Sequence, residues 1–75
     1  MLLGGFALRN KMRAARISKG LTAKDVAREL GVHENAVLRW ESGASEPLGS
    51  NLIKLSKLYE APADVLMEQP QARDL

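Results

Sequence analysis

Side chains that can make two hydrogen bonds at once lie close together near the middle of the chain. Asn35 and Arg39 are four residues apart, so on a helix they would share one face with Glu34 and Leu38. Asparagine can bond the edge of adenine and arginine the edge of guanine, and an α-helix fits the major groove of DNA. Reading of a DNA sequence is therefore the leading hypothesis, provided that the surrounding residues build a helix-turn-helix.

Residues 22–41 contain two short helical patterns that meet at Gly31. Glycine tolerates the positive φ that commonly ends a helix, so Gly31 is expected to end the first pattern. In the second pattern Val37 and Trp40 fall on one side and Asn35 on another. One face of this second helix is therefore expected to be anchored and the other to be free.

The first of these two helices has a recognisable start at Thr22. Its hydroxyl can accept a hydrogen bond from a free amide, and Asp25 follows three residues later, which makes a capping box with Asp in place of Glu or Gln. Val26, Ala27 and Leu30 form the expected buried stripe. Ala27 is small, as the crossing of two helices at a steep angle after a short turn requires.

Residues 7–19 predict an amphipathic helix ahead of this pair. Leu8, Met12 and Ala15 recur at helical steps with basic residues between them. Gly20 ends the pattern in the manner of a helix terminator.

The C-terminal part of the chain predicts a loop followed by two helices. Residues 42–49 are rich in Gly, Ser and Pro, a composition typical of a loop. A helix is expected to begin near Ser50, and Pro62 stands early in a last short helix that ends near Met67. The residues expected to face the core are Leu52, Leu55, Leu58, Tyr59, Val65 and Leu66. No strand pattern occurs, so the sequence predicts an all-α fold of five helices around one core.

The length of the chain predicts one small domain. A protein of 75 residues buries only about 60% of the surface that its unfolded chain exposes. We expect residues 1–6 to form an N-terminal extension, residues 7–67 the folded domain and residues 68–75 a disordered polar tail. The apolar residues of the extension either belong to a frayed end or cover the core or a partner.

The composition excludes several kinds of protein. There is no cysteine, and the only histidine is His33, so neither a disulfide framework nor a metal site can be built. Apolar runs are too short for a membrane span, which predicts a soluble, cytoplasmic protein. No serine stands in a nucleophile-elbow motif, and we expect no enzymatic activity and no cofactor. His33 could cap the helix after Gly31, bind a phosphate or lie half-buried at the turn.

Charge is distributed unevenly along the chain. The net charge is only +2, which is a weak bias for a nucleic-acid binder. Residues 9–28 nevertheless carry seven basic groups and one acidic group, and the part from Glu29 onward is net acidic. The first third of the protein is therefore either a basic patch or an ordinary solvated helix surface.

Several short motifs, in order and at regular spacing, resemble the lambda-repressor-like, Cro/repressor-type helix-turn-helix family, also called the xenobiotic-response-element family. The resemblance runs from Leu8 to Met67, nearly the whole chain. The matching pieces are Arg16, Gly20-Leu21-Thr22, Val26-Ala27, Leu30-Gly31-Val32, Val37, Trp40-Glu41-Ser42-Gly43, Pro47, the helix from Leu52 to Tyr59, and Val65-Leu66. The resemblance implies a compact five-helix DNA-binding domain.

The resemblance also implies a role for individual residues. Arg16 and Glu41 are expected to form a structural ion pair between the first helix and the end of the third. The positions that read bases in the family correspond to Glu34, Asn35, Leu38 and Arg39. The positions that contact phosphate correspond to Thr22, Lys24, His33, Ser50 and Asn51.

Two departures from the family pattern reduce the expected affinity. Many members carry Gln after the cap of the second helix, where this chain has Ala23, so Lys24 is the candidate to replace its phosphate contact. The loop after the third helix, often basic in the family, contains Glu46 here. Binding to one half-site is therefore expected to be weak and to depend on dimerisation or a partner.

The resemblance favours a bacterial or phage-encoded transcriptional regulator, a repressor that binds double-stranded DNA as a homodimer on a two-fold operator and associates with the nucleoid. Two alternatives stay open. One is an antitoxin that binds operator DNA together with a toxin; the other is a protein-interaction module, binding for instance a co-regulator, that keeps the fold and has lost DNA binding. Salt dependence separates them, because only phosphate contacts make the affinity fall steeply with salt.

Overall fold

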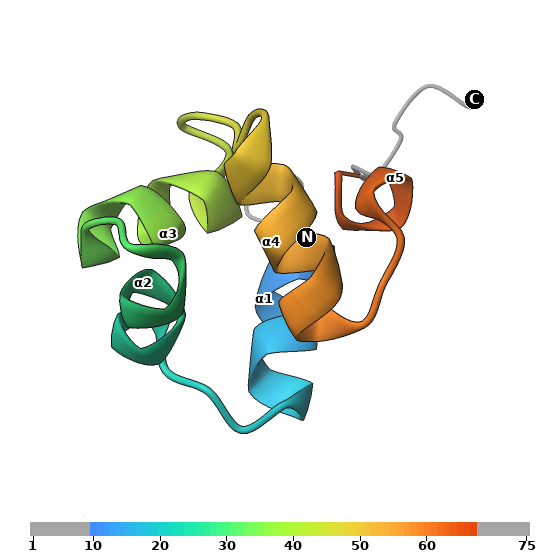
Figure 1. Ribbon diagram of the computed structural model, residues 1–75, viewed down its shortest axis with the longest axis horizontal. Helices are drawn as coiled ribbons and strands as arrows, with labels where there is room; N and C mark the ends of the chain where they lie inside the picture. Colours follow the sequence, from blue (N-terminus) through green and yellow to red (C-terminus); the bar gives the residue numbers. More distant parts are fainter. Residues whose placement is uncertain (1–9, 68–75) are drawn as a thin grey trace, which may run out of the picture.

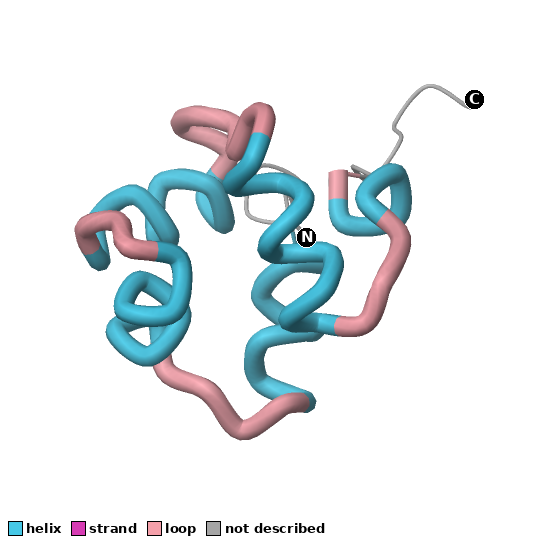
Figure 2. Tube along the Cα trace, in the orientation of Figure 1, coloured by secondary structure: helices cyan, strands magenta, loops and turns pink. Residues whose placement is uncertain are grey.

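The computed structural model describes residues 10–67, and within this part the chain forms five α-helices and no strand. The helices are α1 (Asn10–Ser18), α2 (Ala23–Leu30), α3 (Glu34–Ser42), α4 (Ser50–Tyr59) and α5 (Ala63–Leu66). Short loops join them, and α2 and α3 lie together at one end of the molecule with α5 at the other (Figures 1 and 2). The prediction of an all-α, five-helix fold is confirmed. The expectations for the extension, for Leu8 and for the tail fall on residues outside this range.

The core is a single cluster to which every helix contributes. Its buried members are Met12, Ala23, Val26, Ala27, Leu30, Val37, Trp40, Leu55, Tyr59 and Leu66. Most are aliphatic, as expected for a small chain that contains no cysteine and so has no disulfide to stabilise it. No helix in the described range is long and apolar enough to cross a membrane.

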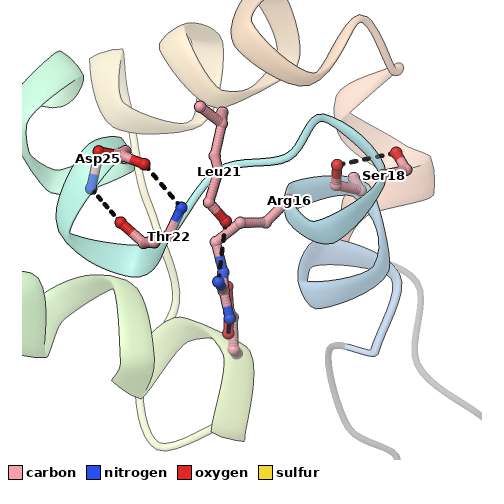
Figure 3. Close-up of polar contacts among 7 residues, drawn as sticks. Arg16, Ser18, Leu21, Thr22 and Asp25 are labelled. Atoms are coloured by element: carbon pink, nitrogen blue, oxygen red, sulfur yellow. Dashed lines mark hydrogen bonds and ion pairs between the residues drawn. The ribbon is translucent and has the colours of Figure 1, made fainter.

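The start of α2 is the predicted capping box (Figure 3). The Asp25 backbone N–H donates to Thr22 Oγ1 at 3.0 Å, and the Thr22 backbone N–H donates to Asp25 Oδ2 at 2.9 Å. These bonds satisfy two amides that have no partner within the helix. The hydrogen bond from the Thr22 backbone N–H lowers the pKa of the Asp25 carboxyl below its ordinary value, and the contact with the Thr22 hydroxyl lowers it further.

Gly31 makes the turn between α2 and α3, as predicted. Its φ of 74° and ψ of 33° are left-handed, a conformation in which a Cβ would be strained. The N–H groups of Gly31 and Val32 both donate to the carbonyl of Ala27, at 2.8 and 2.9 Å. Ala27 is buried beside this turn, which agrees with the expectation that its small side chain allows the two helices to meet closely.

The prediction for the last helix was wrong in one respect. Val65 is 39% exposed, whereas Leu66 is 1% exposed and belongs to the core. Val65 lies about 100° away from Leu66 around the helix, and here this step turns its side chain largely toward solvent. Pro62 is the residue that caps α5 rather than a residue within it, and the helix ends at Leu66.

Candidate nucleic-acid interface

Helix α3 has one buried face and one exposed face. Val37 and Trp40 are 1% and 5% exposed, and both belong to the core. Asn35, Leu38 and Arg39 are exposed on the other side. Within residues 10–67, the side chains of Asn35 and Arg39 make no hydrogen bond or ion pair, so their donor groups are available to a ligand.

Glu34 differs from the other three predicted base-reading residues. It is the first residue of α3 and is half-buried rather than exposed. No ion pair joins it to Arg39 in the described part of the chain. A carboxylate at the first turn of a helix is favourably placed toward the positive end of the helix dipole.

His33 caps α3. The backbone N–H of Asn35 donates to His33 Nδ1 at 3.2 Å, and the imidazole is exposed. Since Nδ1 accepts this bond, the proton of the neutral ring lies on Nε2. Of the three alternatives left open by the sequence, capping is observed and the half-buried position is not. The Nε2–H group remains able to donate to a phosphate.

Arg16 connects three parts of the chain at the end of α3. Its Nε and Nη2 donate to the two carboxylate oxygens of Glu41 at 2.6 and 3.0 Å, and its Nη1 donates to the carbonyl of Leu21 at 3.1 Å (Figure 3). The two side chains are 13% and 8% exposed. The hydrogen bond to Glu41, above all, raises the pKa of Arg16. The pair holds the last turn of α3 against α1.

Tyr59 lies close enough to this ion pair for its ionisation to respond to both charges. Burial, followed by the negative charge of Glu41, raises the pKa of the Tyr59 hydroxyl to about 12. That hydroxyl is buried and makes no hydrogen bond within the described residues. The phenol is therefore a buried group that remains un-ionised at neutral pH.

Within the basic segment 9–28 the structure describes residues from position 10 onward, and ion pairs neutralise several of their charges. Arg16 is paired with Glu41, Lys19 with Glu60 at 2.8 Å, and Arg28 with Asp25 at 3.4 Å. In contrast, Arg13 and Lys24 are exposed and form no ion pair within residues 10–67. The excess of positive charge is thus smaller at the surface than the sequence count suggests.

The other predicted phosphate-contacting residues lie at helix starts. Thr22 precedes α2, Lys24 is exposed in its first turn, and Ser50 and Asn51 begin α4. The residue before α4, Gly49, has φ 56° and ψ −128° and offers no side-chain cap. The backbone N–H groups of Asn51 and Leu52 already donate to the carbonyls of Leu48 and Gly49, so the candidate phosphate donors here are the side chains of Ser50 and Asn51.

A helix-turn-helix family model matches residues 12–66, a range that includes α2, the turn at Gly31 and α3. The chain belongs to this helix-turn-helix family. The family is one of DNA-binding transcription regulators, and the expected Cro/repressor type is confirmed.

Two known proteins are similar to the chain. The cryptic phage CTXphi transcriptional repressor RstR of Vibrio cholerae is 31% identical over 62 residues, which cover 83% of this chain. The matched region is 56% of the length of that repressor, so this helix-turn-helix protein spans little more than half of its relative. The crystal structure of a hypothetical transcription factor, NHTF, from Neisseria superposes with a TM-score of 0.71 at 28% identity and covers 93% of this chain and 80% of that one.

Sequence reasoning did not identify two polar contacts between helices. Lys19, which follows the end of α1, pairs with Glu60, which follows the end of α4, and Lys54 of α4 reaches the last carbonyl of α2, that of Leu30. The partners are 41 and 24 residues apart, so no local spacing signals either contact.

Proposed function

We propose that this helix-turn-helix protein is a transcriptional repressor that binds double-stranded DNA sequence-specifically, with α3 in the major groove. The observation that carries the proposal is the division of α3. Its buried face is anchored by Val37 and Trp40, while the side chains of Asn35 and Arg39 are exposed and have no hydrogen-bond partner within residues 10–67. The printed descriptions of the two similar proteins, a transcriptional repressor and a transcription factor, support the same function.

Each exposed residue of α3 has a chemical role in this proposal. Asn35 reads adenine and Arg39 reads guanine through paired hydrogen bonds, each worth ~1–3 kcal/mol of discrimination. Leu38 contacts the methyl group of a thymine. Glu34, which is half-buried, accepts from cytosine N4 or excludes sequences that cannot satisfy its carboxylate.

The phosphate contacts are proposed for Thr22, Lys24, His33, Ser50 and Asn51. His33 is suited to this role because its Nε2–H is left free by the cap that Nδ1 makes. Lys24 brings a full positive charge, whereas the others donate uncharged hydrogen bonds. With so few charged contacts, one protein on one half-site binds weakly. A homodimer on a two-fold operator, with half-sites about 10–10.5 bp apart, supplies the missing affinity.

The proposal is tested by selecting bound duplexes from a randomised DNA library at low salt. Wild-type protein is compared with Arg39→Ala and with Arg13→Ala, an exposed and unpaired arginine of α1 that serves as the matched control. We expect a two-fold motif that loses its guanine preference in Arg39→Ala and is unchanged in Arg13→Ala. A folded wild-type protein that enriches no motif would overturn the proposal.

A second candidate function is a protein-interaction module with this fold, such as an antitoxin or a partner of a co-regulator. It is favoured by Ala23 in place of the usual Gln and by the ion pairs that neutralise Lys19 and Arg28. Under this alternative, the affinity for the protein partner changes little between low and high salt. Under the repressor proposal, the affinity for DNA falls steeply as the salt concentration rises.

A further inference from the structure

The turn between α2 and α3 receives a side chain from a distant helix. Lys54 Nζ of α4 lies 3.5 Å from the carbonyl oxygen of Leu30 and donates a partly buried hydrogen bond to it. Leu30 is the last residue of α2 and is followed directly by the left-handed Gly31. Lys54 thus contacts the backbone where the chain changes direction into the helix proposed to read DNA.

The Leu30 carbonyl needs a partner from outside the turn. After α2 ends, the N–H groups of Gly31 and Val32 turn back to the carbonyls of Ala27 and Arg28. Within residues 10–67, no backbone N–H donates to Leu30, so Lys54 supplies the hydrogen bond that the turn does not. The carbonyl end of a helix carries partial negative charge, which makes an ammonium group a favourable partner.

From this contact we infer that Lys54 is a positioning residue for DNA reading, a role that rests on the function proposed above. Helix α3 is held at both ends by side chains from other helices. Arg16 of α1 holds its last turn through Glu41, and Lys54 of α4 holds the turn that precedes its first residue. Lys54 fixes the entry of α3, and therefore the direction in which Asn35 points, without touching DNA itself.

Lys57 provides a matched control for this role. It lies one turn further along α4 and is exposed like Lys54, and its side chain makes no hydrogen bond or ion pair within the described residues. Replacing either lysine with methionine removes one positive charge from the same helix and keeps a long side chain. Only the change at position 54 removes a contact to the turn.

The first test measures the affinity for the selected operator as a function of salt concentration, with wild-type protein, Lys54→Met, Lys54→Arg and Lys57→Met. We expect Lys54→Met to bind roughly three- to tenfold more weakly, the range expected for the net contribution of one hydrogen bond. Lys54→Arg should recover most of that loss because its guanidinium can reach the same carbonyl. Lys57→Met should match wild type.

The salt dependence distinguishes positioning from direct contact with DNA. If Lys54 only positions the turn, the slope of log K against log salt concentration in Lys54→Met equals that of wild type. If the magnitude of the slope decreases by the amount expected for the loss of one phosphate contact, Lys54 binds DNA and the inference is overturned. An unchanged affinity in Lys54→Met would also overturn it. Thermal unfolding of each variant, followed by circular dichroism, ensures that only folded proteins are compared.

A second readout does not involve DNA. In NMR spectra of the protein alone, loss of the hydrogen bond should move the carbonyl carbon resonance of Leu30 upfield in Lys54→Met and leave it in place in Lys57→Met. An unmoved Leu30 resonance would show that the contact is absent in solution, which overturns the inference whether or not DNA binds. If the resonance moves as expected but wild-type protein selects no DNA, the proposed function has failed rather than the contact.

Discussion

Arg16 and Glu41 are 25 residues apart in the chain and form a two-pronged ion pair, with N–O distances of 2.6 and 3.0 Å. The planar guanidinium matches both oxygens of the carboxylate, and its third nitrogen, Nη1, donates to the backbone carbonyl of Leu21. One side chain of α1 therefore determines where α3 ends relative to the start of α2. The position of the candidate base-reading residues follows from this contact as well as from the core.

Removal of one partner of this pair should be strongly destabilising. In Arg16→Met the Glu41 side chain, only 8% exposed, would lose its compensating charge, and we expect unfolding to become easier by ~3–5 kcal/mol. Urea denaturation measures the change. The double variant Arg16→Met/Glu41→Leu should recover much of the loss, because no buried charge is left unpaired. A single variant within about 1 kcal/mol of wild type would show that the pair is exposed to water in solution.

Enlarging the side chain at the crossing of α2 and α3 should also be destabilising. Ala27 is buried and its carbonyl accepts the two amides of the turn, so Ala27→Leu has no room to expand without moving α3. The expected cost is ~1–3 kcal/mol. Ala14→Leu, at an exposed position of α1, is the control and should stay within about 0.5 kcal/mol of wild type. Equal stability of the two variants would contradict the close crossing.

The hydroxyl of Tyr59 should contribute nothing favourable to stability at neutral pH. It is buried without a hydrogen-bond partner in the described part of the chain, so Tyr59→Phe is expected to be neutral or to stabilise the fold by up to about 1 kcal/mol. Tyr59→Ala, which removes the ring as well, should cost ~3–5 kcal/mol. A loss above about 1 kcal/mol in Tyr59→Phe would show that the hydroxyl has a partner in solution.

The same residue predicts a dependence of stability on alkaline pH. The pKa of Tyr59 is raised in the folded protein from 10.0 to about 12, so the unfolded chain releases this proton first as pH increases. The stability linked to the neutral phenol is fully present below pH 10.0 and is lost as pH rises toward about 12. Tyr59→Phe lacks this group, and denaturation curves across that interval should show a smaller loss in the variant than in wild type.

The ends and buried faces of the helices could be predicted from the sequence because the interactions that define them are local. Thr22 and Asp25 are three residues apart, so their reciprocal hydrogen bonds require only that one helical turn forms. Gly31 ends α2 through its own φ preference. The division of α3 into a buried face with Trp40 and an exposed face with Arg39 follows from the helical repeat alone.

The choice among contacts that each residue can make depended on the packing of the helices. Whether Val65 or Leu66 enters the core is decided by the angle at which α5 meets the cluster. Residue spacing could not pair Lys54 with the Leu30 carbonyl, because their proximity arises only when α4 lies across the end of α2. The residues proposed to read DNA could therefore be chosen from periodicity and side-chain chemistry. The side chains that hold their helix in place, Arg16 and Lys54, come from α1 and α4, and only the tertiary structure brings them together.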